Sequence, residues 1–155
     1  MGRFSEKLAD VLAYPLVLLY HCVCEITGDR RWYRRQYRKM VSERPALTDE
    51  QFLKAVDARP NDKAVWLAVR EATAQSIGVP AVFVYPEDPL ADLWRMQLVG
   101  PDILDIRFRM ERILSRKLPS SELQAITGGA HYGQQGRFRD FAAQVVEALC
   151  DAKQP

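Results

Sequence analysis

The chain has 155 residues, of which 48% are hydrophobic and 27% are charged, an ordinary composition for a folded protein. Its 22 Lys and Arg residues against 20 Asp and Glu residues give a net charge of only +2, which disfavours a dedicated nucleic-acid-binding protein. A chain of this length suits one domain, or a small domain with an extension, and needs no disulfides to fold. The three cysteines are therefore expected to be reduced, as they are in the cytoplasm.

Residues 1–45 are predicted to form an N-terminal helical extension. Apolar side chains recur at helical spacing over residues 4–26, and residues 11–24 (VLAYPLVLLYHCVC) are the most apolar window of the chain. This window is shorter than the roughly 20 residues that cross a bilayer, so neither a membrane-spanning helix nor a signal peptide is expected. Gly28 is predicted to end this part, and Asp29 to cap the next helix.

That next helix, DRRWYRRQYRKMVSE at residues 29–43, combines cations with aromatic side chains. The preferred interpretation is an amphipathic helix whose aromatic stripe packs on the domain, while its arginines remain solvated or pair with the rest of the chain, which carries a net charge of −2. The second is contact with an anionic membrane surface. Nucleic acid, which arginines and aromatic rings also bind, ranks third because the net charge is low. The basic arm in question consists of Arg30, Arg31, Trp32, Arg34, Arg35, Arg38 and Lys39.

Residues 46–155 are predicted to form a helical bundle. Thr48 and Gln51 fit a capping box at the start of one helix. A second helix is expected from Asn61 or Asp62 to Gly78. The following segment contains three prolines, and its AVFVY stretch at residues 81–85 has the composition of a strand. Since no other segment offers it a partner, extended coil is expected there rather than a sheet.

Two longer helices and a short helical turn between them complete the prediction; the short turn is capped by Ser120 or Ser121 and ended by Gly128 and Gly129. One begins at Asp102, its expected cap, and places Leu104, Ile106, Met110 and Ile113 in the core. A loop at residues 128–136 (GGAHYGQQG) then leads to the last helix. That helix has apolar residues at steps of three and four, which indicate a strongly amphipathic helix: Phe138, Phe141, Val145 and Leu149. The predicted fold class is all-α.

The order of these pieces resembles that of the acyl carrier proteins. The resemblance spans about residues 62–149 and is carried by SIGV at 76–79, PEDPLADL at 86–93, DILD at 102–105 and MERILSRKLPSSE at 110–122. It implies a four-helix bundle in which the serine of a D-S-L motif carries a phosphopantetheine arm. Here that position is Ile103, or Gly100 in an ungapped alignment on Leu118–Pro119. No Ser or Thr occurs from Ile77 to Leu114, so no arm and no other cofactor are expected.

The chain is therefore similar to the serine-lacking, uncharacterised bacterial branch of carrier-like proteins. Carriers dock onto their enzymes through an acidic second helix, whereas residues 102–117 here carry five cations against three acids. The resemblance and this charge together predict a non-catalytic protein–protein interaction module, with its interior filled by Trp66, Phe108 or Phe141. The side chains expected to contact the unknown protein partner are Trp94, Asp102, Arg107, Arg109 and Arg112.

Two alternatives to the interaction module stay open. The first is a membrane-peripheral protein held by the N-terminal apolar and basic helices. The second is a carrier that is modified at another hydroxyl, such as Ser115 or Ser120.

No catalytic or metal site is expected. His21, Cys22 and Cys24 offer a single group of metal ligands, whereas zinc sites commonly combine two pairs. Cys150 could act as a nucleophile only with a distant histidine, His21 or His131, and nothing near it in the sequence supports that role.

Overall fold

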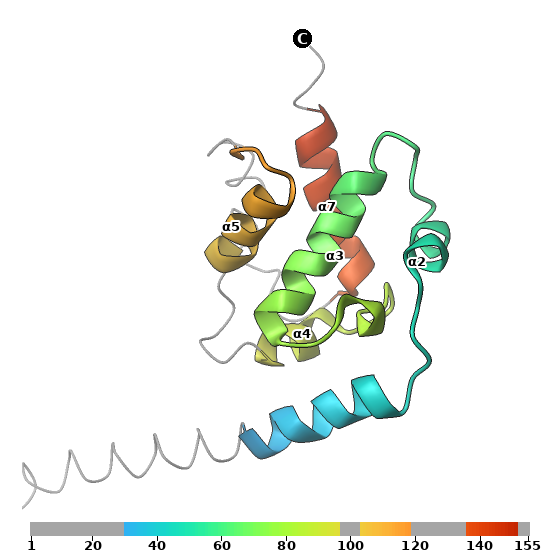
Figure 1. The fold of residues 1–155 in the computed structure, drawn as a ribbon, viewed down its shortest axis with the longest axis vertical. Coiled ribbons are helices and arrows are strands. Elements are labelled where there is room, and N and C mark those ends of the chain that lie inside the picture. Colours follow the sequence, from blue (N-terminus) through green and yellow to red (C-terminus); the bar gives the residue numbers. More distant parts are fainter. Residues whose placement is uncertain (1–29, 97–102, 119–135, 152–155) are drawn as a thin grey trace, which may run out of the picture. The chain divides into compact units, whose positions relative to one another are not determined.

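The computed structural model describes residues 30–96, 103–118 and 136–151. These residues form helices and no strand, which confirms the all-α class for this part of the chain (Figure 1). The first helix in it covers residues 30–42. The chain divides into two compact units, residues 1–37 and residues 38–155, and the domain boundary placed after residue 45 from the sequence stays a prediction. No described helix has both the length and the apolar character that a membrane-spanning segment needs.

Helix α2 (Asp49–Ala55) begins at the capping box that the sequence predicts. The Thr48 hydroxyl accepts a hydrogen bond from the Gln51 amide at 3.3 Å, and the Gln51 side chain accepts one from the Thr48 amide at 3.0 Å. These two bonds satisfy amides that have no partner inside a helix. Phe52, one turn into α2, is fully buried and anchors this short helix to the core.

Helix α3 (Lys63–Ile77) is the central element of the second unit (Figure 1). It packs against α2, α4, α5, α7 and the short 3-10 helix η1. Gly78 ends it with a φ of 71°, a left-handed conformation that costs glycine little, as the sequence predicts. Asp62 occupies the N-cap position, but its side chain makes no capping hydrogen bond.

The proline-containing segment after α3 is more helical than the sequence suggests. Residues Ala81–Phe83 form η1, and helix α4 covers Leu90–Met96. The described residues hold no sheet at AVFVY, so the expectation that it forms no sheet is confirmed for them. Extended coil is only partly correct there, because the Phe83 and Val84 amides close 3-10 hydrogen bonds to Pro80 and Ala81.

Helices α5 (Ile103–Ile113) and α7 (Phe138–Asp151) complete the described core. All four predicted apolar positions of α7 are buried, as are Ile106 and Met110 of α5 and both Trp66 and Phe141. For α5, the structure excludes Phe108 as one of the three alternatives for filling the interior, and the expectation of a buried Ile113 is wrong. Phe108 is 61% exposed, because two residues of helix turn it about 200° away from Ile106. Ile113, the last residue of α5, is 38% exposed, so the buried stripe ends at Met110.

Several predictions lie outside the described residues. They concern the helix over residues 4–26, the cap and contact at Asp102, the alternative attachment position Gly100, the core side chain of Leu104, the Ser120 hydroxyl, the short helical turn capped by Ser120 or Ser121, the loop before Gly136, and the metal and base candidates His21, Cys22, Cys24 and His131.

Candidate partner-binding site

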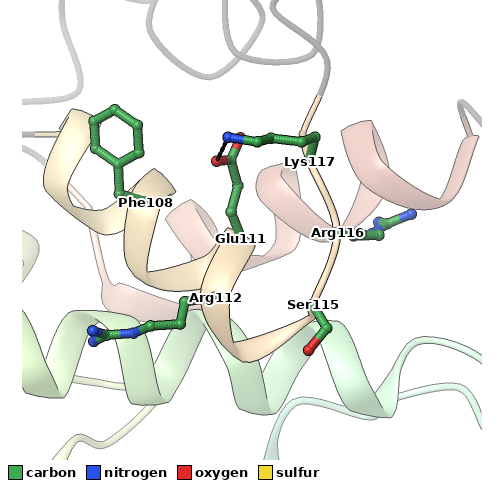
Figure 2. Close-up of a pocket in the computed structure, with 6 residues that line it drawn as sticks. All are labelled: Phe108, Glu111, Arg112, Ser115, Arg116 and Lys117. Atoms are coloured by element: carbon green, nitrogen blue, oxygen red, sulfur yellow. Dashed lines mark ion pairs between the residues drawn. The ribbon is translucent and has the colours of Figure 1, made fainter.

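Helix α5 ends in a left-handed residue that is not glycine, so the sequence gives no sign of this type of helix end. Ser115 adopts a positive φ of 52°, the left-handed conformation usually left to glycine. The Ser115 amide donates to the Arg112 carbonyl at 3.3 Å, and the Arg116 amide donates to the Glu111 carbonyl at 3.1 Å. These are the two bonds of a Schellman motif, which reverses the chain at a helix end. Residues 116–118 therefore return beside α5 (Figure 2).

The returning segment is held against α5 by an ion pair that binds both the amide and the carbonyl of Leu118. The Glu111 carboxylate accepts from the Leu118 amide at 3.0 Å, and Arg107 donates to the Leu118 carbonyl at 2.8 Å. Arg107 and Glu111 also bond to each other at 3.1 Å. The hydrogen bond from the Leu118 amide, helped by Arg107 and Lys117, lowers the pKa of Glu111 below its usual value. Arg107 thus holds the fold together at this point.

An open hollow of about 410 Å³ lies at this end of α5. Its lining combines one exposed aromatic ring with three cations and one carboxylate. The Phe108 ring and the Lys117 side chain project on the same side of α5, and the Lys117 side chain is 92% exposed (Figure 2). The lining residues are Phe108, Glu111, Arg112, Ser115, Arg116 and Lys117. A surface of this kind can pair with acidic groups while the ring contacts an apolar side chain.

The structure brings only part of the predicted contact set to this hollow. Arg112 lines it and also donates to the Gln75 side chain at 3.3 Å. Arg109 pairs with Asp105 at 2.7 Å along the helix. The expectation of an exposed Trp94 is wrong: this side chain is 5% exposed and meets Phe141 edge to face, with ring centroids 5.1 Å apart. Helix α4, which the sequence does not predict, turns Trp94 inward.

Of the six residues that line the hollow, the sequence predicted only Arg112 as a contact; Phe108, Arg116 and Lys117 are the main additions. For Phe108 a signal existed, because its position falls off the Ile106–Met110 stripe. For Arg116 and Lys117 no such signal existed in the sequence. Their return beside α5 depends on the left-handed backbone conformation of Ser115.

A second polar cluster surrounds the buried guanidinium of Arg70, which is 1% exposed. Arg70 donates to the carbonyls of Val84 at 3.1 Å and Leu47 at 2.9 Å, and to the Asp49 carboxylate at 3.1 Å. Its carbon Cζ lies 4.4 Å from the centre of the Phe52 ring. Burial lowers the pKa of Arg70, and Asp49 counteracts this shift. The cluster joins three separate stretches of chain, which is a structural role.

Asp88 is the buried acid in the loop before α4. It accepts from Arg44 at 2.5 Å and from the Tyr85 amide at 2.8 Å. Burial raises the pKa of Asp88, and both hydrogen bonds oppose that shift. Its backbone carbonyl accepts from the Phe138 amide at 2.8 Å, in the first turn of α7. Asp88 therefore holds the loop against α7.

The remaining ionisable groups of the described residues form no further candidate site. A second hollow, of about 350 Å³, contains Trp66, Arg59 and the half-buried Cys150 among its lining residues. Among the residues that the structure describes, no group of three or more His, Cys, Asp and Glu side chains is placed to hold a metal ion.

The basic arm forms part of the helix at residues 30–42. All of its cations are exposed, whereas Trp32 is half-buried. Two further aromatic side chains of this helix, Tyr33 and Tyr37, stack with their ring centroids 6.2 Å apart. Burial, with a contribution from Tyr37, raises the pKa of Tyr33. The helix therefore carries a cationic surface of its own.

Comparison of the chain with known protein families, curated proteins and solved structures finds no match.

Proposed function

We propose that the chain is a non-catalytic, acyl-carrier-like module that lacks the attachment serine and binds a protein partner through the hollow at the end of α5. On this proposal α3, α5 and α7 are the first, second and last helices of a four-helix carrier bundle. The packing of α5 and α7 against a central α3 is compatible with such a bundle. The third helix would fall between Leu118 and Gly136, outside the described residues.

The observation that carries the proposal is the exposed Phe108 ring beside Arg112, Arg116 and Lys117. A large aromatic side chain left in water is a common anchor of protein interfaces, particularly when a polar rim surrounds it. The three cations give this rim a positive charge, so the complementary partner is acidic around an apolar residue. This charge is opposite to that of the docking helix in ordinary carriers.

Ser115 is the hydroxyl that lines this hollow, and its position disfavours the alternative of a carrier modified there. It follows the C-terminal end of α5, where the helix dipole is negative, whereas an attached phosphodiester is favoured at the positive N-terminal end. The cations near Ser115 would attract a phosphodiester, but the helix end at Ser115 is still the negative end of the dipole.

The docking surface can be tested by placing the photoreactive residue benzoylphenylalanine at position 108 of the full chain in its native cell. Irradiation is expected to give one discrete cross-linked product, because Phe108 contacts the partner. Reversing the rim charges with Arg112→Glu and Lys117→Glu is expected to reduce that product at least tenfold, since charge-paired rims govern encounter.

The matched control carries the photoreactive residue at Ala64, an exposed position of α3 outside the hollow. It is expected to give no discrete product. The same product from both positions, no product from position 108, or a product that survives charge reversal would each refute docking at this hollow.

A further inference from the structure

The helix at residues 30–42 has a cationic half that the proposed function does not use. Six of its residues are Arg or Lys, none is Asp or Glu, and all six cations are exposed. At about 100° per residue they occupy one half of the helix circumference. None of the six forms an ion pair with another described residue. They are Arg30, Arg31, Arg34, Arg35, Arg38 and Lys39.

This arrangement is unfavourable for the helix by itself. Like charges four residues apart repel each other along a helix surface, and four such pairs occur here. They are Arg30–Arg34, Arg31–Arg35, Arg34–Arg38 and Arg35–Lys39. A surface that supplies many negative charges at once would relieve this repulsion, whereas a single acidic side chain would not. The helix is therefore suited to an extended polyanion.

Three observations favour a lipid surface over nucleic acid as that polyanion. The six cations form one continuous half, which suits a flat array of headgroups. The most apolar window of the chain, residues 11–24, precedes the helix in sequence. The net charge of +2 does not provide the long-range attraction typical of nucleic-acid binders.

We infer that the helix at residues 30–42 binds the anionic surface of a lipid bilayer through its cationic half. The guanidinium groups pair with headgroup phosphates and carboxylates, which arginine can bind with two parallel hydrogen bonds. This binding goes beyond the proposed docking at α5 and uses different residues. It requires no membrane-spanning segment.

The test is sedimentation of the full chain with vesicles of phosphatidylcholine and phosphatidylserine, and with vesicles of phosphatidylcholine alone. The chain is expected to pellet with the anionic vesicles only, and to be released as the salt concentration rises. Each cation near such a surface strengthens binding about fivefold, so the variant Arg31→Gln, Arg34→Gln, Arg35→Gln is expected to bind about a hundredfold more weakly.

The matched control is Lys54→Gln, Arg59→Gln, Lys63→Gln, which removes three exposed cations from another part of the chain. It is expected to keep nearly all of the vesicle binding. Circular dichroism of both triple variants checks that the helices are intact.

Other outcomes overturn the inference. Equal losses in the two triple variants would show a general charge effect, and equal pelleting with neutral vesicles would assign binding to apolar residues. Binding of a labelled oligonucleotide that the Arg31/Arg34/Arg35 variant loses, with no binding to anionic vesicles, would assign the helix to nucleic acid instead.

Discussion

Replacing Arg70 with methionine is expected to lower the free energy of unfolding by about 3–5 kcal/mol. Methionine fills much of the same space but donates no hydrogen bond. The substitution therefore leaves the carbonyls of Val84 and Leu47 without their donor and removes the cation from the Phe52 ring. The measurement is urea-induced unfolding of the purified chain, with the slope of the transition compared between variants.

Two companion variants separate the causes of this effect. Arg70→Lys keeps the charge but cannot reach three acceptors at once, so it is expected to be nearly as destabilising as methionine. Asp49→Asn weakens only the contact to a carboxylate that is 63% exposed, and is expected to cost less than about 1 kcal/mol. If Arg70→Met changed stability by less than about 1 kcal/mol, the role of Arg70 in joining the chain would be wrong.

Replacing Trp94 with alanine is expected to destabilise the fold by about 3–5 kcal/mol. The side chain is buried against Phe141, so its removal leaves a large cavity between α4 and α7. The exposed Phe108 provides the comparison: Phe108→Ala is expected to change stability by less than about 0.5 kcal/mol. Thermal unfolding, followed by circular dichroism, measures both.

Two results would contradict the roles assigned to Trp94 and Phe108. A Trp94→Ala variant of normal stability that loses its cross-linked partner would make Trp94 a contact residue, as its sequence position suggested. Marked destabilisation by Phe108→Ala would mean that the ring is part of the core, and the hollow would lose its aromatic anchor.

The parts of the fold that the sequence predicts well depend on local signals. The capping box at Thr48 and Gln51, the stop at Gly78 and the apolar stripe of α7 each involve residues of a single helix and its ends. These local signals do not depend on contacts with distant parts of the chain, so the sequence pattern is enough to predict the helix ends and the buried face.

Helix α4 escaped prediction because its start depends on a distant residue. Pro89 breaks the segment in the sequence, but proline is well tolerated immediately before a helix. The Leu90 amide that follows donates to the Gly136 carbonyl at 2.9 Å, a partner 46 positions away. Pro89 and Arg137 also form a β-bridge.

The candidate site was predicted only in part, for a related reason. Arg112 was identified from the charge of its helix, but the apolar character of Phe108 suggested the core. The contribution of Arg116 and Lys117 requires the reversal at Ser115, which the sequence marks with no glycine. The burial of Arg70 could not be predicted from the sequence either, because its hydrogen-bond acceptors lie far from it in the chain, at residues 47, 49 and 84.

The proposed function requires a carrier-like chain that acts without a phosphopantetheine arm. The most direct measurement is the intact mass of the full chain after incubation with a phosphopantetheinyl transferase and coenzyme A, with an ordinary acyl carrier protein modified in the same tube. The mass is expected to stay unchanged, because no Ser or Thr occurs from Ile77 to Leu114. A gain equal to one arm, mapped to Ser115, Ser120 or any other hydroxyl, would contradict the proposed function.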